Sequence, residues 1–168
     1  MSDKPDLRVE LVSNPQYLSG VREMVSQVSR RLGFSDLQCS QLALAVDEAL
    51  ANVMKHGYDR QPDGRIWLDL TPLPDNGHGV GVKIVIEDEA KQIDPLLIKG
   101  RDLEDIRPGG LGVHIIREVM DYAVYEKRGD KGMRLTMMKR QASPPKPGSQ
   151  ACADPGERRG AGDAHGGS

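Results

Sequence analysis

The chain contains 168 residues, of which 23 are Lys or Arg and 25 are Asp or Glu, and its formal net charge is -2. This length predicts one domain with a substantial core and leaves too little chain for a second complete domain. The near-neutral charge balance argues against a protein that follows nucleic-acid phosphates, and no apolar run approaches the ~18 residues that a membrane span needs. We therefore expect a cytoplasmic protein that contacts neither nucleic acid directly nor a membrane.

Hydrophobic periodicity predicts five strands and three helices. Alternating apolar residues, the period of a half-buried strand, occur at 7–11, 66–70, 80–86, 123–125 and 135–137. Apolar residues at helical spacing occur at 14–33, 35–56 and 113–120. Asn14 and Ser35 are suited to cap the first two helices, Gly33 is suited to end the first, and Cys39 is expected in the core.

The segments between these elements complete the predicted architecture. Residues 129–132 predict the turn of a hairpin, and the charged segment 94–108 predicts a mobile loop with a short helix at 96–99. Residues 141–168 contain no Val, Ile, Leu, Met or aromatic side chain, so we expect a disordered tail after a domain over 1–140. The fold class is α+β, a two-layer α/β sandwich whose mainly antiparallel sheet is covered on one face by the long helices.

Two patterns indicate a nucleotide site. Glu48 and Asn52 lie four residues apart on a predicted helix, so their side chains project from the same face. A glycine cluster at 109–112 opens directly into the helix at 113–120, where free backbone N–H groups and the helix dipole favour phosphate. Taken singly, each pattern has a plainer interpretation, a solvated helix flank for the first and an ordinary turn for the second.

Four stretches carry a resemblance to a known family. They are DEALANVMKHGY at 47–58, IEDEA at 86–90 with IDP at 93–95, GGLGVHIIR at 109–117 with MD at 120–121, and the strand at 132–139. They resemble the N-box, the G1 box, the G2 box and the terminal strand of the GHKL ATPase superfamily, in particular its anti-sigma factor serine/threonine-protein kinase family. The resemblance spans residues 7–140, and three motifs in order are more specific than any one alone.

The resemblance implies a role for each matched residue. Asn52 would supply its side-chain oxygen to Mg²⁺, which prefers oxygen ligands and keeps phosphate and water in its octahedron. Glu48 would be the catalytic residue, accepting the proton of an attacking hydroxyl or orienting that hydroxyl toward the γ-phosphate of ATP. Asp88 would accept a hydrogen bond from the adenine amino group.

The resemblance also implies further nucleotide contacts. The matched positions are Ala90, Arg107, Gly109, Gly110, Leu111, Gly112, Val113 and Thr136. The glycines would let the backbone approach the phosphates, and Arg107 would offset their charge. One position departs from the family pattern, because the G1 box usually reads aspartate, any residue, glycine, whereas this chain has Ala90. The added methyl group would crowd the adenine or the backbone turn.

The implied function is an ATP-dependent protein kinase that phosphorylates a serine or threonine of an anti-sigma factor antagonist, a STAS-domain protein, and sequesters a sigma factor. A homodimer is expected, as in the relatives. Two alternatives stay open: a non-catalytic, nucleotide-sensing partner-switching protein, which Ala90 favours, and a stand-alone ATPase. His56 and His114 are interpreted as structural residues.

Overall fold

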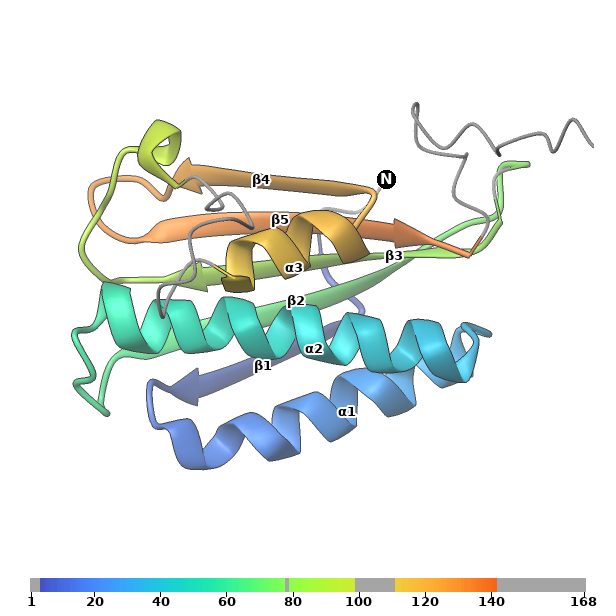
Figure 1. Cartoon of the computed structure of the whole chain (residues 1–168), viewed down its shortest axis with the longest axis horizontal. Coiled ribbons are helices and arrows are strands. Elements are labelled where there is room, and N and C mark those ends of the chain that lie inside the picture. Colours follow the sequence, from blue (N-terminus) through green and yellow to red (C-terminus); the bar gives the residue numbers. More distant parts are fainter. Residues whose placement is uncertain (1–3, 78, 99–110, 142–168) are drawn as a thin grey trace, which may run out of the picture.

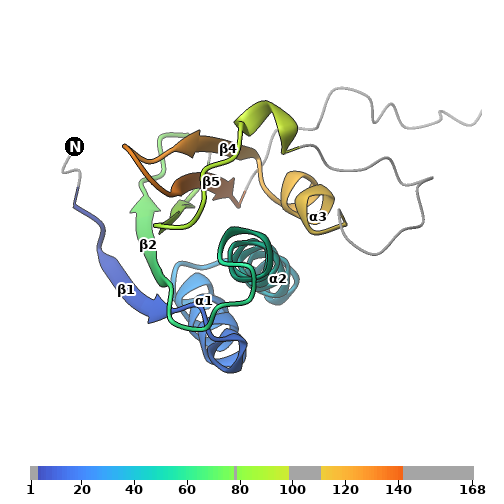
Figure 2. The ribbon, with the colours of Figure 1, turned by 90° about the vertical axis from the view of Figure 1, so that its left-hand side faces the viewer.

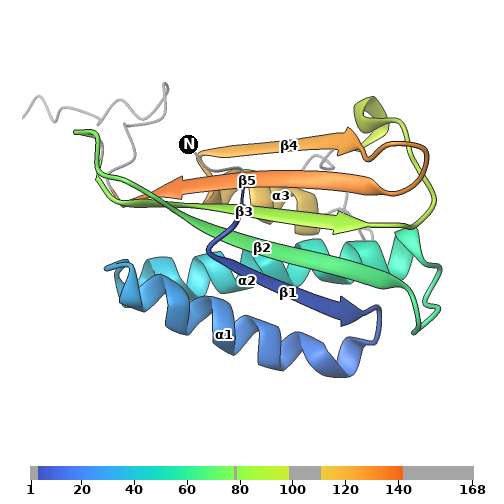
Figure 3. The same ribbon diagram turned by 180° about the vertical axis from the view of Figure 1, so that it is seen from behind.

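Alternating apolar residues build a five-stranded sheet in the computed structural model, which describes residues 4–77, 79–98 and 111–141. The strands are β1 (Leu7–Val12), β2 (Arg65–Leu73), β3 (Gly81–Asp88), β4 (Tyr122–Lys127) and β5 (Met133–Arg140). They pair in the order β1-β2-β3-β5-β4, and every neighbouring pair is antiparallel, as seen from behind the helices in Figure 3. The predicted antiparallel sheet is confirmed.

The helices form the second layer. They are α1 (Leu18–Arg31), α2 (Asp36–Asn52) and α3 (Leu111–Val119), with short helical turns η1 (Pro15–Tyr17), η2 (Val53–Gly57) and η3 (Pro95–Leu97). The α-helices all lie on one face of the sheet, with α3 beside α2 (Figures 1 and 2). The structure therefore confirms the predicted two-layer α+β sandwich.

The core lies between α2 and the centre of the sheet. Leu42, Val46 and Leu50 of α2 are fully buried, as are Ile84 and Ile86 of the central strand β3. Burying each such side chain contributes roughly 1.5–3 kcal/mol, so this contact fixes α2 on the sheet. Cys39 is also buried there, as predicted.

Local sequence signals set the helix boundaries. The predicted capping box is present, because the Ser35 hydroxyl accepts from the Gln38 N–H and the Gln38 side chain accepts from the Ser35 N–H. Asn14 caps the η1 turn, which leads into α1, and Gly33 ends that helix with a φ of +91°.

One boundary differs from the prediction. The helix predicted to reach His56 is α-helical only as far as Asn52 and continues as the π-helical turn η2. Such a turn widens the helix locally and is frequent at functional sites. Here it redirects the chain next to the end of β3.

The hairpin prediction is confirmed, since β4 pairs with β5 around the turn at 129–132. The short helix predicted at 96–99 is the 3₁₀ turn Pro95–Leu97, capped by Asp94. The remainder of the predicted loop and nearly all of the predicted tail lie outside the described residues, so the division into 1–140 and 141–168 stays a prediction. Within the described part, no helix is long and apolar enough to cross a membrane.

Candidate nucleotide site

The start of α3 packs directly on Glu48 and Asn52 of α2. A methyl group placed on Gly112 would lie 2.6 Å from Oε2 of Glu48 and 3.2 Å from Nδ2 of Asn52. With a larger residue at position 112, the ends of these two side chains would have to shift. The structure thus brings together Glu48, Asn52 and the last glycine of the predicted phosphate motif.

Glu48 and Asn52 have no hydrogen-bond or ion-pair partner within the described ranges, and both side chains are half-buried. Polar groups in such positions usually find a partner in the protein or in bound molecules. Both are therefore available to a ligand. The amide oxygen of Asn52 fits Mg²⁺, an ion that takes most of its ligands from phosphate and water.

A cavity of about 220 Å³ extends from Asn52 toward the end of β3. Its described lining includes Ala49, Asn52, Val53, His56, Gly57, Ile86, Asp88, Lys91, Ile93, Leu97, Ile98, Val113, Tyr125, Met133 and Leu135. Most of these side chains are apolar, and Asp88 is the one carboxylate among them. An apolar slot with a single buried polar anchor suits a flat heterocycle such as a purine.

Asp88 is held rigidly at the end of β3, where it is 3% exposed. Its Oδ1 accepts the backbone N–H of Ala90 at 2.9 Å and of Met133 at 3.0 Å. No group in the described segments donates to Oδ2, which leaves that oxygen to accept from a ligand. Burial raises the pKa of Asp88 above its usual value, while the two N–H donors and Arg128 act in the opposite direction.

The turn between β4 and β5 fixes the segment that follows Asp88. The Gly132 N–H donates to the Ala90 carbonyl at 3.0 Å, and the Arg128 guanidinium donates to the Asp88 carbonyl at 3.4 Å. Gly132 has a φ of +81°, and a methyl group there would lie 1.9 Å from the Asp88 carbonyl oxygen. The predicted hairpin therefore holds the base-binding end of the cavity in place.

Tyr58 supports the same segment from the other side. Its hydroxyl accepts the Glu89 N–H at 2.9 Å and donates to the Arg65 carbonyl at 2.6 Å. Burial raises the pKa of Tyr58, so the phenol stays protonated near neutral pH and can make both hydrogen bonds.

Three polar residues of the lining were not predicted as ligand contacts. His56 was interpreted as structural, yet it lines the cavity with Asn52. The available signal was that His56 follows Asn52 by four residues, a spacing that places both on one helix face. Tyr125 alternates in phase with Ala123 on β4, and burial raises its pKa to about 12, which keeps the hydroxyl a donor. Lys91 follows the G1 motif and carried no signal of its own.

Several predicted contacts are placed differently. The prediction that Thr136 contacts the nucleotide is corrected. Thr136 lies on the opposite face of the sheet from Met133 and Leu135, so it cannot line this cavity. Val113 lines the cavity, whereas Ala90 and Leu111 are not among its described lining residues. The predicted contacts Arg107, Gly109 and Gly110 lie outside the described residues.

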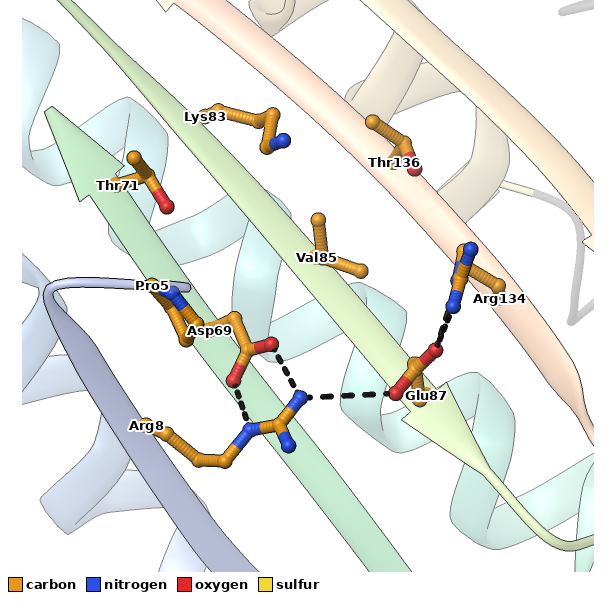
Figure 4. Close-up of a pocket in the computed structure, with 9 residues that line it drawn as sticks. All are labelled: Pro5, Arg8, Asp69, Thr71, Lys83, Val85, Glu87, Arg134 and Thr136. Carbon is orange, nitrogen blue, oxygen red and sulfur yellow. Dashed lines mark hydrogen bonds and ion pairs between the residues drawn. The ribbon is translucent and has the colours of Figure 1, made fainter. Parts of the chain in front are cut away.

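Thr136 faces a second, more polar cavity of about 390 Å³ on the open face of the sheet (Figure 4). There, the Arg8 guanidinium donates twice to the Asp69 carboxylate at 2.6 Å, and Arg134 lies 2.5 Å from the carboxylate of Glu87. The chain's own ion pairs thus satisfy both carboxylates on this face. In the described ranges, no group of three or more His, Cys, Asp or Glu side chains is arranged to hold a metal ion.

Comparison with known families is consistent with this geometry. Residues 11–139 match the family described as "Histidine kinase-like ATPase domain". Serine-protein kinase RsbW of Listeria monocytogenes serotype 4a (strain HCC23) is 31% identical over 144 residues, which cover 83% of this chain and 88% of that protein. The Anti-sigma F factor of Clostridium botulinum (strain Eklund 17B / Type B) is 30% identical over 142 residues, which cover 80% of this chain and 93% of that protein.

The chain therefore belongs to the histidine kinase-like ATPase family, in its branch of RsbW-like anti-sigma factor serine kinases. The resemblance inferred from the motifs is confirmed. A crystal structure of the RsbU and RsbW domains of a Mycobacterium tuberculosis protein shares the fold, with a TM-score of 0.54 and 17% identity. The match covers 82% of this chain and 32% of that longer chain.

Two glycines of the β4–β5 turn provide a matched test of how Asp88 is held. Both have positive φ, but a methyl group on Gly129 meets nothing within 4 Å, whereas one on Gly132 meets the Asp88 carbonyl. We expect Gly129→Ala to lower the free energy of unfolding by about 1 kcal/mol through strain alone. Gly132→Ala should lower it by about 3 kcal/mol or more. Urea denaturation measures both, and equal losses would contradict the close packing of Gly132 on Asp88.

Proposed function

We propose that this chain binds Mg²⁺ and ATP in the cavity between α2, α3 and the end of β3, and transfers the γ-phosphoryl group to a serine or threonine of a protein. The observation that carries the proposal is the contact of Gly112 with Glu48 and Asn52. It brings a carboxylate, an amide and the start of α3 together beside an apolar cavity whose lining includes Asn52 and Val113.

In this proposal Asp88 and the apolar walls hold the adenine, with Oδ2 of Asp88 accepting from its amino group. Asn52 holds the ion that neutralises the phosphates at the other end of the cavity. The start of α3 directs backbone N–H groups and its positive dipole end toward the phosphates. The triphosphate therefore lies along the junction of α2 and α3.

Glu48 performs the proton step. The acceptor hydroxyl oxygen attacks the γ-phosphorus, the bond from that phosphorus to the β–γ bridging oxygen breaks, and ADP leaves. The hydroxyl proton passes to a carboxylate oxygen of Glu48, which carries no competing ion pair within the part of the chain that the structure describes. The products are ADP and a phosphoprotein.

We further propose that the acceptor is an anti-sigma factor antagonist of the STAS-domain type and that the chain, as a homodimer, sequesters a sigma factor. Relatives named serine-protein kinase RsbW and anti-sigma F factor support this reading. The alternative, a non-catalytic nucleotide sensor, rested on Ala90 narrowing the cavity. Ala90 is absent from the described lining, so its methyl group does not narrow the described cavity.

Glu48→Gln separates catalysis from binding. We expect phosphate transfer from labelled ATP to the candidate antagonist to fall by roughly 100-fold or more, because general-base catalysis is removed. ADP affinity, measured by calorimetry, should stay within about threefold because the adenine and phosphate contacts remain. The matched control is Glu126→Gln, which changes an exposed carboxylate on the strand face opposite the cavity.

The outcomes of this assay are distinct. Unchanged transfer by Glu48→Gln would remove Glu48 from the mechanism. Nucleotide binding without any transfer by the unsubstituted chain would establish the non-catalytic alternative instead. Steady phosphate release without a protein acceptor would favour a stand-alone ATPase.

The raised pKa of Asp88 predicts a pH-dependent affinity for ADP. Since Oδ1 already accepts two N–H groups, the proton taken up at low pH goes to Oδ2 and converts it from an acceptor to a donor. The dissociation constant should therefore rise as pH falls, and the rise should begin above the usual pKa range of an aspartate, approaching about tenfold per pH unit below the pKa.

Asp88→Asn should weaken ADP binding by roughly 10-fold to 100-fold at neutral pH and abolish this pH dependence, because no carboxylate remains to titrate. Calorimetry at each pH measures both quantities. Equal affinity of the variant, or the same pH profile in the variant and the unsubstituted chain, would exclude Asp88 as the adenine anchor.

A further inference from the structure

Gly57 and Ala90 meet where the end of α2 reaches the segment after β3. A methyl group placed on Gly57 would lie 2.9 Å from the Cβ atom of Ala90. Two methyl carbons do not approach this closely in well-packed proteins, because their van der Waals contact distance is about 3.5–4.0 Å. The side chain of Ala90 therefore occupies the space that a side chain at position 57 would need.

Close approach is the reason for the glycine at position 57. Its φ is not among the positive values that make glycine necessary at Gly33, Gly129 and Gly132. The backbone of Gly57, the last residue of the η2 turn, would thus accept an alanine without conformational strain. Only the methyl group of Ala90 opposes that substitution.

Ala90 is in turn bound to the adenine anchor. Its N–H donates to Oδ1 of Asp88 at 2.9 Å, its carbonyl accepts the Gly132 N–H at 3.0 Å, and its side chain is buried against Gly57. Ala90 is buried, so a methyl group added at Gly57 would push the whole residue and, with it, the N–H that donates to Asp88. Gly57 itself lines the cavity, whereas Ala90 is absent from the described lining.

We propose that Gly57 and Ala90 form a complementary pair that positions the carboxylate of Asp88 for the nucleotide base. The absence of a side chain at Gly57 is what allows this chain to carry alanine where the family motif has glycine. The methyl group fills space over the η2 turn rather than the cavity, so base binding depends on the two positions jointly. This inference rests on the proposed nucleotide function and adds two positioning residues to it.

A double-substitution cycle tests the pair through the affinity for Mg²⁺ and ADP, measured by calorimetry on the full chain. Gly57→Ala alone should weaken ADP binding about tenfold, the usual size of an overpacking effect. In the Ala90→Gly background the same Gly57→Ala change should alter affinity by less than about threefold, because the opposing methyl group is gone. The matched control is Gly20→Ala in α1, where an added methyl meets nothing within 4 Å and affinity should not change.

A comparison of two ligands, one with and one without the base, separates the positioning role from a loss of fold stability. Affinity for inorganic triphosphate, which lacks the base, should be the same in Gly57→Ala and the unsubstituted chain, while affinity for ADP differs. An equal loss of both affinities would mean that Gly57→Ala disturbs the fold rather than Asp88, and would overturn the positioning role. Rescue of ADP binding in the double variant completes the expected result.

The remaining outcomes are also decisive. The pairing would be overturned if the double variant loses as much ADP affinity as Gly57→Ala alone. It would also be overturned if Gly57→Ala alone keeps full ADP affinity. If Gly57→Ala fails to fold, folding and ADP binding by the double variant support the pair, and failure of the double variant overturns it. If the unsubstituted chain does not bind ADP, the proposed function itself fails. If it binds ADP but the effects of the two substitutions on affinity simply add, only the pairing fails.

Discussion

The site depends on the close approach of α3 to α2 at Gly112. That glycine brings the first turn of α3 within contact of Glu48 and Asn52, so that a helix N-terminus and two polar side chains face the same space. Burial of the α2 core side chains against β3 fixes α2, and with it the position of the polar pair. A side chain at position 112 would displace the carboxylate of Glu48 and crowd the amide of Asn52, the two groups proposed to act at the phosphates.

The opposite end of the cavity is built by hydrogen bonds rather than by helix packing. Asp88 ends the central strand, and its carboxylate is oriented by N–H groups of Ala90 and Met133. The β4–β5 turn and Tyr58 hold the same segment from two sides. The sheet and the helices therefore each supply one half of the site, and the cavity has its shape only when both layers are packed.

Much of this arrangement follows from local patterns. The spacing of Glu48 and Asn52 placed them on one helix face, and alternation in the last two strands correctly assigned their buried face. The same alternation puts Thr136 out of phase with Leu135, so the error there came from following the motif instead of the strand period. The π turn at Val53–Gly57 and its contact with Ala90 arise from long-range packing, which no local pattern encodes.

A crystal structure of the chain grown with ADP and Mg²⁺ tests the central claim most directly, because it locates the nucleotide. The account predicts the adenine amino group at hydrogen-bond distance from Oδ2 of Asp88, and the ion bound to the side-chain oxygen of Asn52. Nucleotide seated instead on the open face of the sheet, beside Arg8 and Arg134, would contradict it.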